Sequence, residues 1–264
     1  MPDKPLRRRP NRTTAHLPLS VFVVPGLPEI KKGQDLAKSI IFAARRHGIS
    51  FQDGDILVVA QKIVSKAEGR VVRLSSVKPS PQAGALAQKI AHDPRFVEVV
   101  LRESRRIVRA DRVLIVETRH GLVCANAGVD HSNLPRRDCV TLLPKKPDAS
   151  ARRLAAALRK RLRKRIAVII SDTFGRPWRL GLVNFAIGAA GVPVLRDLRG
   201  TRDRNRKLLT STVLAVADEL AAAAGLLMDK ASGTPVIVIR GYRYRSCWDP
   251  ASSIIRPTNE DLFR

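Results

Sequence analysis

The chain has 264 residues, of which 44% are hydrophobic, enough apolar material for a folded core in one or two domains. Lys and Arg outnumber Asp and Glu by 49 to 23, so the formal net charge is +26. A field of that sign attracts nucleic acids, anionic membranes and phosphorylated small molecules alike. Aromatic residues make up only 4%, and neither Trp178 nor Trp248 is interleaved with a basic run, which argues against a base-stacking platform.

Cysteine usage and apolar runs bear on the compartment. Cys124, Cys139 and Cys247 are an odd number without a Cys-x-x-Cys pair, which is typical of reduced thiols in a cytoplasmic protein. No apolar run approaches the roughly 20 residues that cross a bilayer, so we expect no membrane segment. Residues 1–16 are rich in basic residues and proline and lack the apolar region of a signal peptide. We expect them to be a disordered basic leader.

The first 70 residues alternate between strand and helix patterns. Leu17–Val24 predicts a strand, and Asp35 can cap a helix that ends near Gly48. Ile56–Ala60 is entirely apolar, the pattern of a strand buried on both faces. The polar residues 61–69 follow it, and lysine and glycine after a strand suggest phosphate binding. The spacing of a P-loop is absent, however, so a solvated loop is the preferred interpretation.

Two helices and a hairpin are predicted next. Pro81–His92 and Pro94–Ile107 carry apolar residues three and four apart, and Val113–Val116 pairs through a turn with Leu122–Ala125. The segment 126–133 that follows, Asn-Ala-Gly-Val-Asp-His-Ser-Asn, collects small and oxygen-bearing residues at the end of a strand. Its Asp130 is either a metal ligand or an ordinary turn residue. The neighbouring His120 and His131 are secondary candidates for ligands or bases.

A basic helix is predicted to start at Asp148 or Ser150, with Leu154, Leu158 and Leu162 as its apolar stripe. Its other face is lined with Arg and Lys as far as Arg165 and could bind nucleic acid or an anionic membrane. Because cations in the last turns also complement the helix dipole, a solvated face is preferred.

The last third of the chain contains an Arg-rich segment and two further elements. Residues 195–207 predict a polar loop, and Leu208–Met228 predicts a long Ala-rich helix able to pack against a second copy of the chain. Val236–Ile239 predicts a last buried strand, and residues 246–264 form a C-terminal tail.

We expect the chain to be organised around the stretch from Ile166 to Leu182. Ile166–Ile170 is an apolar strand pattern that we expect to stop at Ser171, Asp172 and Thr173. Their oxygens would then lie at the carboxyl end of a buried strand, where open α/β sheets bind ligands, and they suit a divalent cation carrying phosphate. Arg176 and Arg179 add guanidinium groups that match phosphate or carboxylate. From this stretch alone, a helix cap followed by solvated arginines is as compatible.

Asp130 and Asp172 become more informative as a pair. If they meet across a cleft, they can hold one or two divalent ions, as phosphoryl-transfer sites require.

Several long motifs, in order, resemble the coenzyme F420-0:L-glutamate ligase (CofE) family. The likeness rests on Pro25–Ile30, Gly54–Gly69, Asn126–Asn133, Ser171–Gly181 and Phe185–Gly191, and runs from about Val21 to Tyr242. The resemblance implies an α/β fold of mixed sheets flanked by helices, in one ligase domain over residues 17–245, and an intertwined homodimer.

The resemblance also implies an activity. Members form an amide between L-glutamate and the lactyl carboxylate of F420-0, often adding further γ-linked glutamates, and release GDP and phosphate from GTP. The implied ions are Mg²⁺ or Mn²⁺, up to two of them, with K⁺ as a further candidate. GTP, L-glutamate and F420-0 are therefore the expected partners, and nucleic acid and membrane are not.

The motifs carry site residues over by position. Asp130, Asp172 and Thr173 match metal ligands. The nucleotide contacts implied or expected are Leu27, Pro28, Glu29, Ile30, Gln61, Lys62, Lys66, Asn133, Met228 and Lys230. Catalysis is expected to depend on Asp130, Asp172, Lys66 and Arg176, the last from its chemistry alone.

The chain departs from the family pattern in two places. It has Gln61-Lys62 where some members have Ser-Thr, and Lys230 where some have Glu or Gln as an extra metal ligand. A protonated lysine cannot coordinate a cation. Either the second metal has fewer protein ligands, or Lys230 meets phosphate directly.

Two alternatives stay open. A non-catalytic protein that binds nucleic acid or membrane surfaces would explain the net charge, but not two acidic, glycine-flanked strand exits in a basic chain. A ligase of the same fold with a variant of the F420-0 acceptor would fit every motif.

Overall fold

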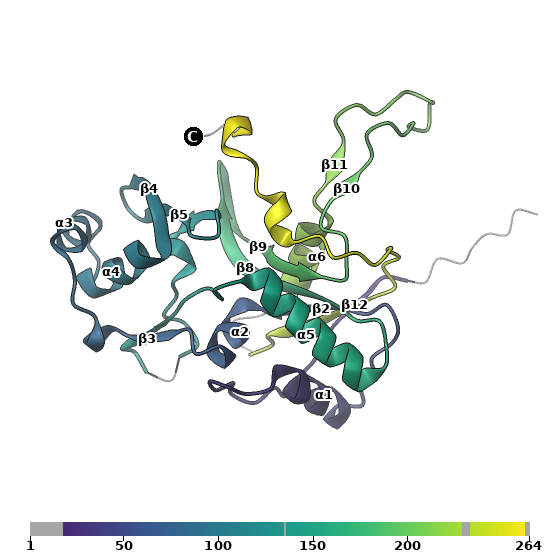
Figure 1. Ribbon diagram of the computed structural model, residues 1–264, viewed down its shortest axis with the longest axis horizontal. Helices are drawn as coiled ribbons and strands as arrows, with labels where there is room; N and C mark the ends of the chain where they lie inside the picture. Colours follow the sequence, from purple (N-terminus) through teal and green to yellow (C-terminus); the bar gives the residue numbers. More distant parts are fainter. Residues whose placement is uncertain (1–17, 135, 229–232, 262–264) are drawn as a thin grey trace, which may run out of the picture.

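The computed structural model describes residues 18–134, 136–228 and 233–261. It combines a five-stranded sheet flanked by helices with a smaller unit of two helices and short strands, which lies at the left of Figure 1. The predicted α/β class with mixed sheets is confirmed. The basic leader predicted for residues 1–16 lies outside the described residues.

The central sheet has the strand order β1-β12-β2-β8-β9. Its strands are β1 (Ser20–Val23), β2 (Ile56–Ala60), β8 (Ala167–Arg176), β9 (Arg179–Ala190) and β12 (Val236–Arg240). β2 and β8 run parallel, and the other neighbours pair antiparallel. Leu57 and Val59 of β2 pack on one face of the sheet and Ile56 and Val58 on the other, so β2 is buried on both faces as predicted.

Helices cover both faces of this sheet. α1 (Leu36–Arg46) and α5 (Pro147–Leu162) lie on one face and α6 (Val216–Gly225) on the other (Figure 1). The predicted cap of α1 is confirmed, because the Asp35 side chain accepts a hydrogen bond from the backbone N–H of Lys38. α5 starts at Pro147, slightly before either predicted residue, since proline suits the first position of a helix.

Gly188 of β9 lets α5 approach the sheet. A Cβ at this position would lie 2.5 Å from the carbonyl carbon and oxygen of Pro147. We therefore expect Gly188→Ala to lower the free energy of unfolding by about 1–3 kcal/mol, as overpacking of a close contact does, measured by urea denaturation. Gly84→Ala is the matched control, because a Cβ there meets no atom within 4 Å. Equal stability of the two variants would contradict this contact.

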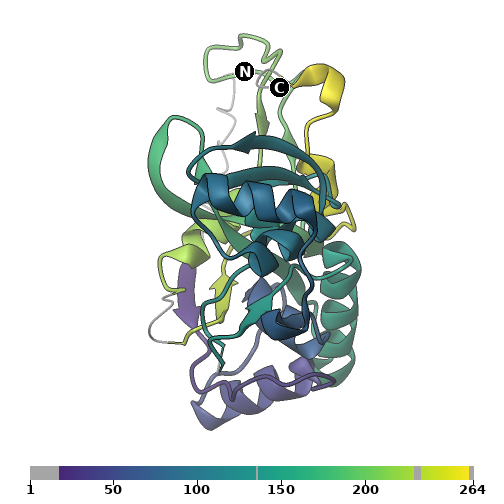
Figure 2. The same cartoon turned by 90° about the vertical axis from the view of Figure 1, so that its left-hand side faces the viewer.

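The smaller unit faces the viewer in Figure 2. It contains α3 (Pro81–Ile90), α4 (Pro94–Glu103), a sheet of β4 (Ser104–Ala110), β5 (Leu114–Thr118) and β6 (Val123–Ala125), and the pair β3 (Val71–Arg73) and β7 (Cys139–Thr141). Phe96 and Val100 of α4 share an apolar core with Leu114 and Val116 of β5. The predicted β5–β6 hairpin is confirmed.

Three predicted segments are corrected. The helix predicted to reach Ile107 ends at Glu103, because the following residues pair with β5 as β4. The loop predicted after β2 is a helix, α2 (Gln61–Ala67), in which Ser65 and Lys66 are buried. The long helix predicted for Leu208–Met228 is only α6, because β11 (Val213–Leu214) pairs with β10 (Arg196–Asp197) in a projecting arm that includes the Arg-rich segment.

The strand expected to stop at Ile170 continues to Arg176. The pairing of β8 with β2 ends at Ala60, which lies opposite Ser171. Beyond Ser171, β8 continues to pair with β9 as a long hairpin. Asp172 and Thr173 therefore lie in this hairpin, just beyond the carboxyl end of β2, and the helix-cap interpretation of Asp172 is wrong.

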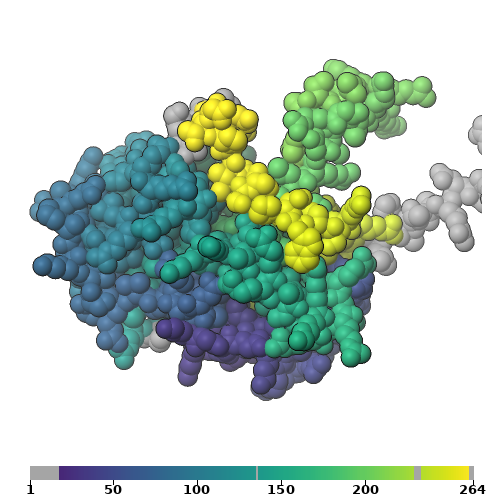
Figure 3. Space-filling view, in the orientation of Figure 1, coloured from purple at the N-terminus to yellow at the C-terminus, as the bar shows by residue number. Residues whose placement is uncertain are grey.

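The C-terminal segment lies across the surface beside α5, as the yellow atoms in Figure 3 show. The backbone N–H of Ala251 donates to the Asp148 carboxylate at 2.7 Å, and Ser246 Oγ contacts the carbonyl of Gly191 at 3.2 Å. Across the described residues, no helix combines the length and the apolar character that a membrane crossing needs.

Candidate functional site

A cavity of about 540 Å³ lies where β2 ends, between segments that are far apart in the sequence. Its walls come from residues 27–30, from residues 60–63 and Lys66, from residues 133–134, from residues 171–173 with Asn184, and from Met228 with residues 233–235. Ligand pockets typically have volumes of roughly 300–1,000 Å³, so the cavity can take a small molecule.

Most of the residues predicted from the sequence line this cavity. They are Leu27, Pro28, Glu29, Ile30, Gln61, Lys62, Lys66, Asn133, Asp172, Thr173 and Met228. Arg176 lies elsewhere, in the β8–β9 hairpin, where its Nη2 donates to the carbonyl of Leu180 at 2.7 Å. Lys230 lies outside the described residues.

Helix α2 carries two lysines, Lys62 and Lys66, that each pair with an acidic side chain. The two lysines lie on one face of the helix because they are four residues apart. Lys62 Nζ is 2.7 Å from Asp130 Oδ2 and also contacts Ser132 Oγ. Lys66 Nζ is 2.6 Å from Glu29 Oε1 and donates to the carbonyl oxygen of Asn133 at 2.7 Å. Both side chains are largely buried, at 13% and 9% exposed. The chain thus places two positive charges in the wall of the cavity.

Asp130 contacts the cavity wall by pairing with Lys62, which lines the cavity. Its backbone is fixed by paired hydrogen bonds with Thr141, and its Oδ1 accepts from the N–H of Ser132 at 2.7 Å. Burial alone would raise the pKa of the carboxyl group, but the hydrogen bonds from Lys62 and Ser132 outweigh it and hold the pKa below its usual value. Asp172 thus lines the cavity, whereas Asp130 contacts the cavity-lining residue Lys62 and is not itself among the lining residues.

Asn184 lines the cavity but was not predicted from the sequence. Its Oδ1 accepts from Thr173 Oγ1 at 2.9 Å, and its Nδ2 lies 3.3 Å from the sulfur of Met228. The one available signal was that an amide side chain interrupts an otherwise small and apolar run from Val183 to Val194. Asn184 fixes the orientation of the Thr173 hydroxyl.

One buried donor at the cavity wall lacks a partner. Gln61 is 1% exposed, and its Oε1 accepts from Ser65 Oγ, but its Nε2 has no hydrogen-bond partner among the described residues. An unsatisfied buried donor costs about 1–3 kcal/mol. A ligand with acceptor oxygens, such as a phosphate or a carbonyl, would remove that cost.

Oxygen donors at the cavity wall are of the kind that a hard divalent cation takes. Asp172 and Thr173 line the cavity with one carboxylate and one hydroxyl. Mg²⁺ typically takes one or two carboxylates and completes its shell with phosphate and water. Within the described parts of the chain, no group of three or more His, Cys, Asp or Glu side chains converges.

Neighbouring titratable side chains do not supply a nucleophile. Burial and the charge of Asp172 raise the pKa of Cys124 to about 12, so its thiol stays protonated. His131 stacks on Phe96 at 4.8 Å between ring centroids, and His120 Nε2 lies 2.9 Å from the carbonyl oxygen of Pro144. Both histidines therefore have packing or hydrogen-bonding roles.

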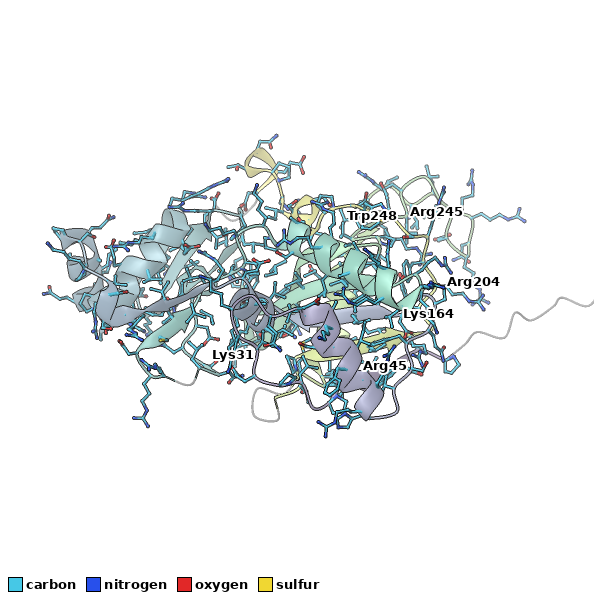
Figure 4. The ribbon with its side chains drawn as sticks, turned by 60° about the horizontal axis from the view of Figure 1, so that its bottom comes forward. Lys31, Arg45, Lys164, Arg204, Arg245 and Trp248 are labelled. Carbon is cyan, nitrogen blue, oxygen red and sulfur yellow. The ribbon has the colours of Figure 1, made fainter. Side chains whose placement is uncertain are left out.

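Many basic side chains, including the four considered next, are not among the residues that line this cavity. In Figure 4, the labelled Arg45, Lys164, Arg204 and Arg245 spread over one end of the molecule. Several cations on and after α5 are used inside the chain, since Arg153 pairs with Glu68, Arg161 with Asp35 and Arg165 with Asp53. These pairs favour the solvated-face interpretation over a polyanion-binding helix.

Comparison with known proteins identifies the family. Residues 26–241 match the family model described as F420-0:gamma-glutamyl ligase. Proteins named coenzyme F420:L-glutamate ligase are 44% identical in Methanothermobacter thermautotrophicus, over 93% of this chain and 99% of that protein, and 45% identical in Methanopyrus kandleri, over 93% and 98%. The corresponding protein of Methanocaldococcus jannaschii is 41% identical over 90% of this chain and 94% of its own length. The chain therefore belongs to the F420-0:gamma-glutamyl ligase family.

Proposed function

We propose that the protein is a GTP-dependent ligase of coenzyme F420 biosynthesis, which joins L-glutamate to the carboxylate of F420-0 in the cytoplasm. The observation that carries the proposal is the cavity itself, which brings Asp172 and Thr173 together with Lys62, Lys66 and Glu29 from distant parts of the chain. These are the charges that a metal-bound nucleotide and a carboxylate substrate require.

The chain's own residues would mainly bind and orient. Asp130, Asp172 and Thr173 would hold Mg²⁺ or Mn²⁺, which supplies charge neutralisation and polarises phosphoryl oxygens, with K⁺ as a further candidate ion. Lys66, held by Glu29 and the Asn133 carbonyl, would offset phosphate charge. The Gln61 amide would donate to a nucleotide oxygen. The apolar side chains of Leu27, Pro28, Ile30 and Pro235 would exclude water from the reacting groups.

The reaction needs activation because a carboxylate does not react with an amine at neutral pH. In the proposed course, a carboxylate oxygen of F420-0 bonds to the γ-phosphorus of GTP and the bond to the β-phosphate oxygen breaks, releasing GDP. The glutamate amine then attacks the acyl phosphate carbon, phosphate leaves, and the amine loses a proton. Neither step needs a protein nucleophile, so catalysis depends on positioning and electrostatics.

A homodimer is part of the proposal. The β8–β9 hairpin, which projects from the body in Figure 2, exposes Trp178 by 81%, Leu180 by 99% and Leu182 by 62%. Exposed apolar side chains gathered on one element are typical of a protein interface. A second copy of the chain that covers this hairpin would place Arg176 at the interface, where its guanidinium could meet substrate.

We expect Leu180→Asp to shift the protein from dimer to monomer, because the charge would have to be buried on association. Light scattering coupled to size-exclusion chromatography measures the mass. Phe42→Asp on α1, 58% exposed, is the control and should leave the mass unchanged. A Leu180→Asp protein with the mass of a dimer would contradict the interface.

The activity itself is tested by incubating the full chain with F420-0, L-glutamate, GTP and Mg²⁺ or Mn²⁺, followed by mass analysis. The expected product is F420-0 extended by one or more glutamyl residues, and no product is expected when GTP or the metal is omitted. If no ligation occurs and the protein instead shows tight, salt-sensitive binding of DNA or RNA on filters, the nucleic-acid alternative replaces this proposal. Ligation of only a modified F420-0 would identify a variant acceptor.

A further inference from the structure

The carboxylate of Asp130 is already paired with a positively charged side chain of the protein, that of Lys62. Lys62 Nζ lies 2.7 Å from Oδ2, the same oxygen that accepts from Ser132 Oγ at 3.1 Å, while Oδ1 accepts from the N–H of Ser132. Both oxygens of this carboxylate therefore have donors. A divalent cation that uses Asp130 must either share this carboxylate with the Lys62 ammonium group or displace it.

Sharing is unfavourable. Two cations in contact with one carboxylate repel each other, and the Lys62 side chain is only 13% exposed, so little water screens the repulsion. Lys62 also cannot simply move away unpaired, because a largely buried ammonium group needs a counter-charge. The nearby acidic side chain of Glu29 is already paired with Lys66, which lies on the same helix face and also donates to the Asn133 carbonyl. Glu29 is therefore not an alternative counter-charge for Lys62.

Another anion can reach Lys62 from the cavity. Lys62 lines the cavity, whereas Asp130 is not among the lining residues, so an anion bound in the cavity can reach the ammonium group that pairs with Asp130. A nucleotide phosphate there would be an alternative partner for Lys62.

We propose that Lys62 is a tethered counter-ion that exchanges partners: it neutralises Asp130 in the free protein, and it passes to a phosphate of the nucleotide when a divalent cation takes Asp130. The inference rests on the proposed function only in taking its metal and nucleotide as ligands. The exchange makes the two ligands bind cooperatively, because the metal displaces Lys62 and the phosphate receives it. By linkage, each ligand then raises the affinity of the other by the same factor.

The test measures binding of Mn²⁺ to the full chain by electron paramagnetic resonance, with and without GDP. For the wild type we expect weak binding without nucleotide and at least about tenfold tighter binding with GDP, the lower range of allosteric coupling. Lys62→Gln should bind Mn²⁺ at least about tenfold more tightly than wild type without nucleotide, and the gain from GDP should fall to a few-fold at most. Lys62→Thr should repeat this pattern, and Lys62→Arg, which keeps the charge, should resemble the wild type.

Lys66→Gln is the matched control, since it removes the same charge from the same face of α2 but leaves the Lys62–Asp130 pair in place. It should not raise the affinity for Mn²⁺ in the absence of nucleotide. The exchange is overturned if Lys62→Gln binds Mn²⁺ no more tightly than wild type, if its coupling to GDP is unchanged, if Lys66→Gln shows the same gain, or if no variant binds Mn²⁺. A protein that shows the expected pattern but forms no glutamyl product would retain the exchange and lose the ligase function.

Discussion

Replacing Asp172 by asparagine should lower the rate of glutamate ligation by at least about 100-fold, the size of effect seen when one preorganised electrostatic group is removed from an active site. Asparagine has nearly the shape of aspartate but no charge, so it cannot neutralise a divalent cation beside Thr173. The backbone at this position is held by pairing with Phe185 of β9, and the fold should therefore persist. The rate of glutamate ligation with F420-0, GTP and Mn²⁺ measures the loss of activity. The thermal melting temperature measures whether the fold persists.

Asp197→Asn makes the same chemical change at a control position. Asp197 lies in the β10–β11 arm, where it pairs with Arg199, and it is remote from the cavity walls. Its ligation rate should match the wild type. A Asp172→Asn protein with wild-type turnover would refute the assigned role, and an equal loss in both variants would show that the effect is not specific to the cavity.

Replacing Arg240 by methionine should lower the free energy of unfolding by about 3 kcal/mol, because it leaves the buried carboxylate of Asp55 without its cationic partner. Arg240 Nε and Nη2 donate to the two oxygens of Asp55 at 2.8 and 2.7 Å, and the Asp55 side chain is 1% exposed. This pair joins the end of β12 to the turn before β2. For a protein of this size the loss corresponds to a fall in melting temperature of roughly 6 to 12 °C, which calorimetry measures.

Two comparisons isolate the buried charge. Arg199→Met breaks the exposed pair with Asp197 and should cost under about 1 kcal/mol. The double variant Arg240→Met with Asp55→Asn should lose less than Arg240→Met alone, since no uncompensated charge remains. If Arg240→Met costs no more than Arg199→Met, the buried pair does not contribute as argued.

Local chemistry made part of the fold predictable. The Asp35 cap, the doubly buried β2 and the β5–β6 hairpin each depend on residues adjacent in the sequence, and all three were confirmed. Of the two acidic motifs, the one around Asp172 lines the cavity with Asp172 and Thr173, and the one around Asp130 contributes Asn133 to the lining while Asp130 pairs with Lys62. That these residues hold a cation stays a prediction.

The errors have a common cause. β8 continues past Ile170 because β9 supplies hydrogen-bond partners for polar residues that would not form a strand alone. Likewise, β11 pairs with β10 in the first part of the segment that was predicted to be one long helix, and β4 pairs with β5 beyond α4. Pairing with a distant strand outweighs local propensity, since backbone hydrogen bonds are obligatory and propensities are small.

By itself the sequence determined the Asp35 helix cap, the doubly buried strand β2 and which motifs carry residue types suited to metal and phosphate, because these follow from side chains a few positions apart. Only the tertiary structure decided that Lys62 faces Asp130, that Asn184 orients Thr173, and that Arg176 lies away from the cavity in a projecting hairpin. Those relations join residues separated by long loops, and the free energy that selects them comes from packing and strand pairing across the whole sheet.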